Sequence, residues 1–405
     1  MIDDRPPVAA KPRARTPATA ADVRERWRMG VEARWLVLIS AVLTAFGLAV
    51  LYSASAFVAM REHTFSGYFL VRQLGGVAAG LVVFAISAKV DADKLKDWAW
   101  LLMCLAMAAM AAVLVLPNSI APTLHGSRRF LFGASFQPSE FAKLAVVIWV
   151  SMLIVKKGDS LRRLTKGLLP FLVVIGVLDV LAAVEPDLSV ALLFTLLMAL
   201  LLFVGGARWG HFIAIVALCL PLTLTRIEKW RYAMSRITAF LHPGNAPETV
   251  SFQLKQSLIA VGSGGLLGRG FGEGMQQTLF VTFPYSDFVA SNVGEEWGFL
   301  GIAGVTIAFA LYALLGFRIA RKARSPFLQL VAVGLTFTTV LTAFLHIGVV
   351  IGLLPTTGLT LPFVSYGRSN LVLTMCFTGI LVNIGSSKER VIGSTATNPL
   401  AVARR

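Results

Sequence analysis

Long apolar runs alternate with short polar stretches along most of the chain. An α-helix needs roughly 20 mainly apolar residues to cross a bilayer, and each run approaches or exceeds that length. The pattern therefore predicts an all-α polytopic membrane protein with ten transmembrane helices. The runs cover roughly 35–58, 70–88, 98–117, 140–155, 168–184, 188–205, 210–225, 297–317, 327–353 and 370–386.

Three polar segments lie outside these runs. Residues 1–34 are rich in Pro, Ala and Arg and lack apolar periodicity, which predicts a disordered tail. Because the first run is too long for a signal-peptide core and follows this tail, we expect no cleavage. Residues 226–296 form a large loop between the seventh and eighth helices, and residues 388–405 form a second tail. The membrane domain is thus predicted to span 35–387.

Positive charge is distributed unevenly between the loops. The chain has a net charge of +16, although only 14% of its residues are charged, against about 25% in soluble domains. Lys and Arg cluster in every second loop, at 1–34, 89–96, 156–166, 208, 318–324 and 387–405. The short intervening loops hold only Arg61, Arg72, Arg128, Arg129 and Arg368. This asymmetry follows the positive-inside rule, so it predicts cytoplasmic termini and explains the basic charge without nucleic acid.

The sequence contains no recognisable zinc or nucleotide motif. Cys104, Cys219 and Cys376 lie far apart within apolar runs, and the five histidines are scattered. This spacing does not favour a structural zinc site or metal binding by imidazole. The absence of a P-loop argues against an ATP-driven pump.

Two short polar motifs lie at helix ends predicted to face away from the cytoplasm. In FQPSEFAK, Lys143 follows Glu140 by three residues, on the same helical face, and enters an apolar run. A charge within the membrane needs a partner or a wet cavity, so these two residues form either a structural pair or a substrate contact. In EPDL, Asp187 either caps the next helix or contacts a cation or a sugar.

The long loop divides into three parts. Residues 225–241 have the amphipathic pattern of a helix on the membrane surface, with arginines that can attract a phosphate-bearing lipid. The glycine-rich stretch 262–272 either forms turns or brings backbone N–H groups to a phosphate. Asp287, in the sequence YSDF, precedes the eighth helix by too many residues to complement its dipole. A carboxylate at such an apolar boundary tends to have a raised pKa and can act as a base.

The stretch PTTGLTLPFVSYG (355–367) closely resembles the signature of the SEDS family (shape, elongation, division and sporulation), which includes FtsW and RodA. Further stretches resemble the family in the same order. They are YSAS (52–55), YFLVRQL (68–74), FQPSEFAKLA (136–145), EPDL (185–188), QSLIAVGSGGLLGRGFG (256–272) and SDFVASNVGEEWGFLG (286–301). The resemblance covers about 35–387.

The resemblance implies an activity as well as a fold. It implies ten helices and a peptidoglycan glycosyltransferase at the outer face of the cytoplasmic (inner) membrane. The implied substrate is lipid II, a disaccharide-pentapeptide on undecaprenyl pyrophosphate. The implied partners are a class B penicillin-binding protein, which is a transpeptidase, and other membrane proteins of the division machinery.

The resemblance also implies site residues. The family's catalytic aspartate matches Asp287, which we expect to act as general base for the acceptor 4-hydroxyl. Expected substrate contacts are Gln137, Glu140, Lys143, Asp187, Arg129, Ser286, Ser365 and Tyr366. Lys143 and some of Arg128, Arg129, Arg231 and Arg236 are expected to hold the pyrophosphate. A divalent cation (Mg²⁺ or Mn²⁺) could assist the leaving group, but no acidic cluster specifies one.

The chain departs from the family pattern at several positions. Tyr285 replaces the histidine of the usual HTDF motif, Arg368 stands where glycine is usual, and His346 stands where asparagine is common. The basic tail 1–34 is more typical of FtsW-like division members than of RodA-like elongation members. The prolines and glycines of 354–370 predict a loop that dips into the mouth of the site, where Arg368 either contacts pyrophosphate or extends to water.

Two alternatives come from other functional classes. A lipid II flippase would need a polar path to the cytoplasmic face, whereas the polar residues concentrate on the other side. A non-catalytic scaffold for division proteins would tolerate the loss of Asp287.

Overall fold

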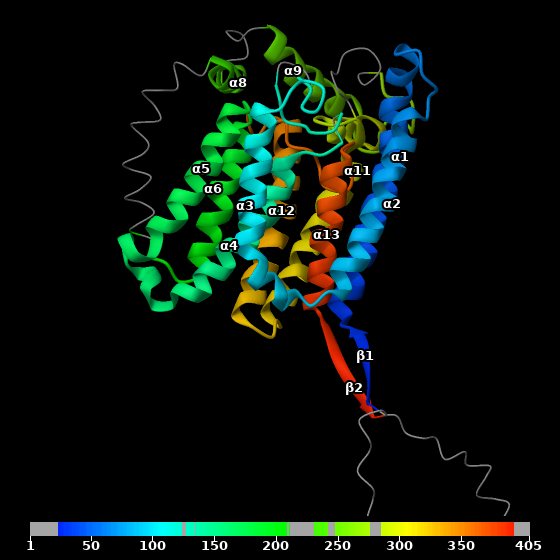
Figure 1. Cartoon of the computed structure of the whole chain (residues 1–405). Helices are drawn as coiled ribbons and strands as arrows, with labels where there is room; N and C mark the ends of the chain where they lie inside the picture. The colour runs from blue at the N-terminus through cyan, green and yellow to red at the C-terminus, as the bar shows by residue number, and fades with distance from the viewer. Residues whose placement is uncertain are drawn as a thin grey trace, which may run out of the picture.

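The computed structural model is a bundle of long helices with a two-stranded ribbon at one end (Figure 1). The structure describes residues 23–123, 127–133, 135–208, 210, 231–241, 248–275 and 285–392. The long helices are α1 (Val31–Arg61), α2 (Tyr68–Lys89), α3 (Leu95–Val115), α4 (Pro138–Lys157), α5 (Leu169–Val184), α6 (Leu188–Val204), α11 (Val289–Arg321), α12 (Pro326–Val350) and α13 (Arg368–Ile384). The other helical segments are η2 (Ala92–Lys94), η3 (Gly158–Arg162), η4 (Leu164–Leu168), α8 (Arg231–Leu241) and α9 (Glu248–Ser263).

Six helical segments in the described part of the chain are long and apolar enough to cross a membrane. They are α1, α2, η2–α3, α4–η3, α11 and α12. Three further apolar helices, α5, α6 and α13, are shorter. The protein is therefore a mostly helical, multi-pass membrane protein.

The apolar runs predict these helices well. Nine of the ten runs match described helices, and the tenth, 210–225, lies outside the described residues apart from Gly210. The largest difference is at α11, which begins at Val289 rather than near 297. The first part of α11 is polar. This part ends at a kink at Gly298, whose φ is +64°. Hydropathy detects only the apolar part beyond this kink.

Helix α4 lies at the centre of the bundle. Most of its residues are buried, including the large ring of Trp149, and it packs against α3, α6, α12 and α13. On another side, α2 and α13 pack closely through glycine. A Cβ on Gly80 would lie 2.4 Å from Met375 Sδ, and one on Gly379 would lie 2.7 Å from the Phe84 carbonyl oxygen. The starts of α4 and α13 are joined by a hydrogen bond from Asn370 Nδ2 to Glu140 Oε2.

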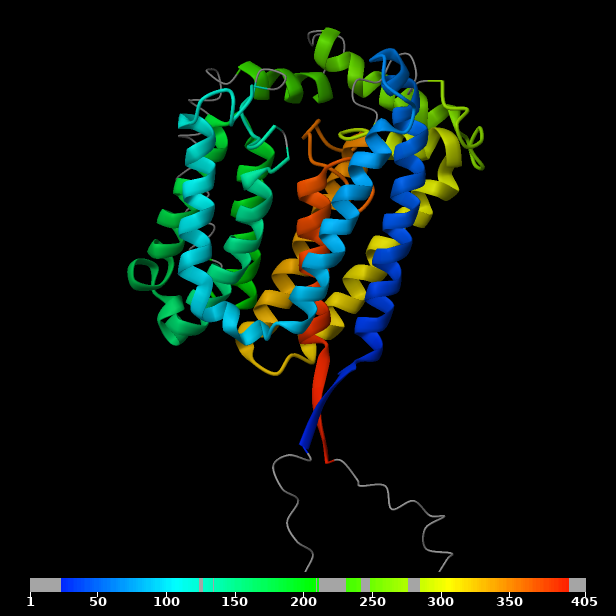
Figure 2. The same cartoon turned by 45° about the vertical axis from the view of Figure 1, so that its right-hand side comes forward.

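Helices α8 and α9 lie across one end of the bundle, which we call the α8–α9 end (Figure 2). The glycines after α9 pack against α11 backbone, since a Cβ on Gly264 would lie 1.9 Å from the Gly294 carbonyl oxygen. A Cβ on Gly268 would lie 2.1 Å from the Glu296 carbonyl oxygen. These glycines therefore serve close backbone packing at the α11 kink, and of the two interpretations of the cluster the structure favours a structural one.

Strands β1 (Val23–Met29) and β2 (Ser386–Ile392) pair antiparallel and leave the opposite end, which we call the ribbon end. The Gly30 N–H donates to the Gly385 carbonyl oxygen, which joins the two chain segments where they enter the bundle. Residues 23–34 thus have regular structure, contrary to the predicted disorder of the whole tail 1–34. Strand pairing satisfies their backbone groups, and local apolar periodicity carries no sign of such long-range pairing.

Candidate functional site

Asp287 lies in the short segment that leads into α11, at the α8–α9 end. The Ser286 hydroxyl donates a hydrogen bond of 3.1 Å to Asp287 Oδ1. Desolvation by the surrounding protein raises the pKa of Asp287, while the Ser286 hydroxyl and the charges of Arg236 and Arg129 oppose the shift. A carboxylate with a raised pKa beside two guanidinium groups suits proton transfer near an anionic substrate.

The signature loop (351–367, between α12 and α13) holds this segment by hydrogen bonds. The Tyr366 N–H donates to the Tyr285 carbonyl oxygen at 2.8 Å, and the Ser365 hydroxyl donates to the Ser286 carbonyl oxygen at 2.7 Å. Gly358 has a φ of +73°, and a Cβ there would lie 3.8 Å from Asp287 Oδ2. The loop therefore fixes the backbone that carries Asp287 and lies against its carboxylate.

The loop reaches into the bundle, as the sequence predicted. Gly47 of α1 makes room for it, since a Cβ there would lie 2.6 Å from the Phe363 carbonyl oxygen. Phe363 is buried, its φ is +64°, and its ring lies 6.0 Å from that of Tyr312 on α11. Irregular backbone at this depth is tolerated because protein surrounds it.

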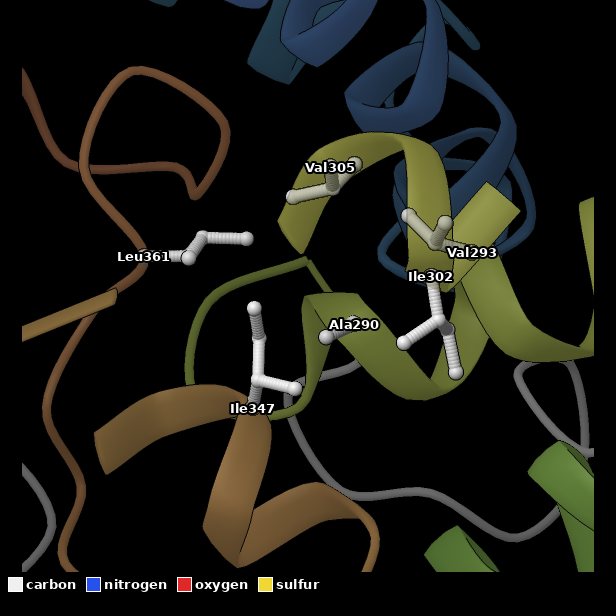
Figure 3. Close-up of a pocket in the computed structure, with 6 residues that line it drawn as sticks. All are labelled: Ala290, Val293, Ile302, Val305, Ile347 and Leu361. Carbon is white, nitrogen blue, oxygen red and sulfur yellow. The ribbon is translucent and has the colours of Figure 1, made fainter. Parts of the chain in front are cut away.

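His346 on α12 forms a further link between the loop and the start of α11. Its Nδ1 lies 2.7 Å from the Leu359 carbonyl oxygen, and its Nε2 accepts from the Ala290 N–H at 3.5 Å. Because Nε2 must accept, the proton sits on Nδ1 and the ring is neutral. Beside this junction, aliphatic side chains from α11, α12 and the loop face one another around a small apolar gap (Figure 3). The gap is lined by Ala290, Val293, Ile302, Val305, Ile347 and Leu361.

Glu140 and Lys143 form a buried ion pair on α4, with 2.7 Å between Lys143 Nζ and Glu140 Oε1. Asn370 Nδ2, at the start of α13, donates to the other carboxylate oxygen at 3.3 Å. This structural pairing leaves Lys143 close enough for its charge to act on Asp187. Gln137, which precedes the helix, donates its backbone N–H to the Ser369 hydroxyl at 3.0 Å.

Asp187 has the capping role, which is one of its two predicted interpretations. It caps α6 by accepting from the Val190 N–H, and it pairs with Arg129 at 3.4 Å. Arg129 also donates from Nε to the Glu185 carbonyl oxygen at 3.1 Å. Desolvation by burial raises the pKa of Asp187, and for Glu185 desolvation followed by the charge of Asp187 raises the pKa to about 8. Arg129 opposes both shifts.

Two contacts connect the signature loop with α6 and α8. The Ser189 hydroxyl donates to the Thr357 carbonyl oxygen at 2.7 Å, and Arg236 Nη1 donates to the Thr356 carbonyl oxygen at 3.0 Å. The loop therefore lies between the EPDL turn and the Asp287 segment. No sequence signal pointed to these carbonyl acceptors, because any residue provides one.

Tyr366 belongs to an aromatic cluster rather than to the charged group. Its ring lies 5.6 Å from that of Tyr285 and 5.4 Å from that of Phe69 on α2, and the rings of Tyr285 and Phe69 stack at 4.6 Å. Tyr285, which replaces the family's usual histidine, thus packs the Asp287 segment onto α2. The cluster forms an apolar wall beside Ser286 and Ser365.

Two candidate anion contacts, Arg128 and Arg368, form hydrogen bonds with neighbouring loop residues. Arg128 donates to the carbonyl oxygens of Leu116 and Ala121, so it stabilises its own loop. Arg368 donates to the Ser135 hydroxyl at 2.9 Å, so it joins α13 to the segment before α4. The side chain of Arg231 lies outside the described residues.

The described residues contain no group of three or more His, Cys, Asp or Glu side chains that could hold a metal ion. The two neighbouring carboxylates, Glu185 and Asp187, have Arg129 beside them. A guanidinium group at that position competes with a cation. This donor set therefore does not fit a resident divalent metal.

Comparisons with known proteins agree with these motifs. A family model described as the FtsW, RodA and SpoVE cell cycle proteins matches residues 33–390. A probable peptidoglycan glycosyltransferase FtsW of Geobacter sulfurreducens is 35% identical over 355 residues, which are 87% of this chain and 94% of that protein. The stage V sporulation protein E of Bacillus subtilis is 34% identical over 351 residues, which are 86% and 95% of the two chains.

Solved structures share the fold. A chain from a peptidoglycan synthase complex that coordinates polymerization and crosslinking aligns with a TM-score of 0.73 and 24% identity, over 87% of this chain and 97% of that chain. The rod shape determining protein RodA of Thermus thermophilus aligns with a TM-score of 0.63 and 24% identity, over 87% and 95% of the two chains. The chain described here belongs to the FtsW, RodA and SpoVE family of cell cycle proteins.

Proposed function

We propose that the protein is a peptidoglycan glycosyltransferase that polymerises lipid II into glycan strands during cell division. The proposal rests on the arrangement of residues around Asp287. A carboxylate of raised pKa is fixed by the signature loop and lies within the electrostatic reach of Arg129 and Arg236. The relatives named peptidoglycan glycosyltransferase FtsW support the same activity.

In the proposed reaction the acceptor's 4-hydroxyl oxygen attacks C1 of the donor sugar. The new C1–O4 bond forms, and the bond between C1 and the pyrophosphate oxygen breaks. Asp287 takes the hydroxyl proton, and undecaprenyl pyrophosphate leaves with the bonding electron pair. A single displacement of this kind inverts C1 from the α to the β configuration. General-base catalysis of this type contributes typically about 10²–10⁴-fold.

The leaving pyrophosphate requires positive charge. Arg129 and Arg236 are the guanidinium groups whose charges act on Asp287, and the charge of Lys143 acts on Asp187 from α4. We assign these three side chains to the pyrophosphate, because Arg129 and Arg236 act on Asp287, and Arg129 and Lys143 act on Asp187. Glu140 and Asp187 position Lys143 and Arg129 through their ion pairs. Gln137 stays a predicted substrate contact, and we assign Ser286, Ser365 and Tyr366 to the sugar side of the site.

We further propose the arrangement in the membrane. The alternation of basic loops supports cytoplasmic termini, ten membrane helices, and an outer position for the long loop that precedes α11. The ribbon end then faces the cytoplasm, and Asp287 lies at the outer face. A class B penicillin-binding protein at the division septum, together with other division proteins, is the proposed partner set. The basic tail supports a division role over an elongation role.

A polymerisation assay tests the activity against the flippase alternative. The purified chain with its transpeptidase partner, in detergent, should convert lipid II into glycan strands that a gel separates by length. Because no bilayer separates two sides in detergent, flipping cannot produce that signal. Absence of polymer from the intact complex, together with lipid II transfer across vesicle membranes, would overturn the proposal.

A further inference from the structure

A charged cavity opens at the ribbon end, far along the bundle from Asp287. Its volume is about 480 Å³, within the range of roughly 300–1,000 Å³ that small-molecule sites occupy. The described residues that line it are Glu32 of α1, Arg318 and Arg321 of α11, and Lys322 just after α11. The lining thus has three positive groups and one negative group.

The single carboxylate in the cavity is already engaged. Glu32 forms an ion pair with Lys322. Within the part of the chain that the structure describes, neither Arg318 nor Arg321 forms a side-chain hydrogen bond or an ion pair, although the charge of Arg318 also acts on Glu32. The neighbouring Arg324 differs, because it pairs with Asp91 at 2.5 Å and with Asp93 at 3.0 Å. The cavity therefore retains two guanidinium groups, each of which can bind a phosphate through two parallel hydrogen bonds.

Helices α1, α11 and α13 pack closely near the residues that line the cavity. A Cβ on Gly385 would lie 3.2 Å from Ile319 of α11 and 3.3 Å from Ala33 of α1, and both of these side chains are buried. The ends of α1, α11 and α13 therefore meet beside the cavity. A positive side chain such as Arg321 is favourable at the carbonyl end of α11 because of the helix dipole. That effect explains a basic residue at this position, but it does not explain the cavity between α1 and α11.

Apolar side chains continue from the cavity along both helices. Phe317 and Leu314 precede Arg318 and Arg321 on the same face of α11, and both are exposed. On α1, Trp35 and Leu38 follow Glu32 and are about half exposed. Exposed apolar faces of this kind suit acyl chains, and tryptophan is enriched at the level of lipid headgroups.

We propose that this cavity binds the phosphate headgroup of an anionic phospholipid, with its acyl chains along α1 and α11. The charge selects a phosphate diester that carries no compensating amine, such as phosphatidylglycerol. The apolar faces select a lipid over a free phosphate. The lipid site lies away from Asp287, so a negative result for lipid binding would not contradict the proposed polymerase activity, and the reverse also holds.

Native mass spectrometry of the full-length protein in detergent tests the proposal, with phosphatidylglycerol and phosphatidylcholine added together. The variant R318Q/R321Q removes both guanidinium groups. The matched control is R162Q/R163Q, because these two arginines are exposed near the same end but do not line the cavity. We expect phosphatidylglycerol affinity to fall about 30-fold in the first variant and less than about twofold in the control, from the typical contribution of a basic residue near anionic lipid.

Two further arms complete the experiment. The variant R318K/R321K keeps the charge but loses the planar fork, so it should bind with intermediate affinity, and its elution volume in size-exclusion chromatography checks the fold. Inorganic phosphate at millimolar concentration should leave phosphatidylglycerol bound. The proposal would be overturned if R318Q/R321Q and R162Q/R163Q bound phosphatidylglycerol with the same affinity, whether reduced or not. Full displacement of phosphatidylglycerol by inorganic phosphate would also overturn it.

Discussion

At the residue scale, the site combines side chains that sequence motifs identify with contacts that they do not. Asp287, Asp187 and Arg129 stand out in the sequence as charged residues in the polar segments between apolar runs, and the structure joins the latter two in an ion pair. The hydrogen bonds of Ser365 and Arg236 end on backbone carbonyl groups. Such acceptors exist at every residue, so only the folded chain determines which ones are used.

The raised pKa of Asp287 predicts how the reaction depends on pH. A general base must be deprotonated, so the rate should fall as pH decreases through the pKa of Asp287. Because desolvation raises that pKa, the fall should occur at higher pH than for an exposed aspartate. Initial polymerisation rates at saturating lipid II, measured across pH, give this profile. A rate that stays constant down to the pKa of an ordinary aspartate would contradict the assignment.

Glu185 predicts a change of stability with pH. Its pKa in the folded protein is raised to about 8 from 4.5, so the stability that it contributes is fully present below pH 4.5 and is lost as pH rises through about 8. The variant E185Q carries no titratable group, so it should lose less stability than the unmodified protein between pH 6 and pH 9. Thermal unfolding at several pH values measures the difference. Parallel curves for the two proteins would show that Glu185 does not titrate there.

The donor set predicts the response to chelation. Since the described carboxylates do not form a metal cluster, we propose that any Mg²⁺ or Mn²⁺ needed for activity enters with the pyrophosphate of the substrate. EDTA should then lower the polymerisation rate without lowering the unfolding temperature of the substrate-free protein. A lower unfolding temperature on chelation would instead indicate a resident metal.

At the element scale, the helices are predictable from sequence and their interruptions are not. Apolar runs locate α1, α4 and α12 within a few residues, because membrane helices must satisfy their own backbone groups. The polar start of α11 and the strands β1 and β2 escape such a prediction, since they depend on tertiary contacts and not on hydropathy. The prolines and glycines of the signature loop mark it as irregular, but its links to Asp287 emerge only in the folded chain.

His346 offers a test of those links. An asparagine at this position can still donate to the Leu359 carbonyl from about the place of Nδ1, whereas phenylalanine fills the space without a hydrogen bond. We therefore expect H346N to retain most polymerase activity. H346F should lose roughly 10–100-fold in kcat, since an unpaired buried polar group costs about 1–3 kcal/mol. Equal activity in the two variants would show that the hydrogen bonds of His346 do not position Asp287.

At the scale of the whole molecule, the fold places two different chemistries at opposite ends. The α8–α9 end gathers the acid, the arginines and the signature loop, whereas the ribbon end has exposed basic residues and the charged cavity. The loop charges alone predict that basic residues gather at one end of the molecule, because the positive-inside rule acts on whole loops. The cavity itself is not predictable from sequence, since Glu32 and Lys322 are almost 300 positions apart along the chain.

We infer that Asp287 is the general base of a lipid II polymerase. The most direct test compares D287N with D159N, whose aspartate is exposed in η3, close to the ribbon end. Each variant is purified with the transpeptidase partner, and glycan strands made from lipid II are quantified on a gel. We expect D287N to form polymer at least about 100-fold more slowly than the unmodified complex, and D159N to form it at the unmodified rate. If D287N formed polymer at the unmodified rate, Asp287 would not be the general base.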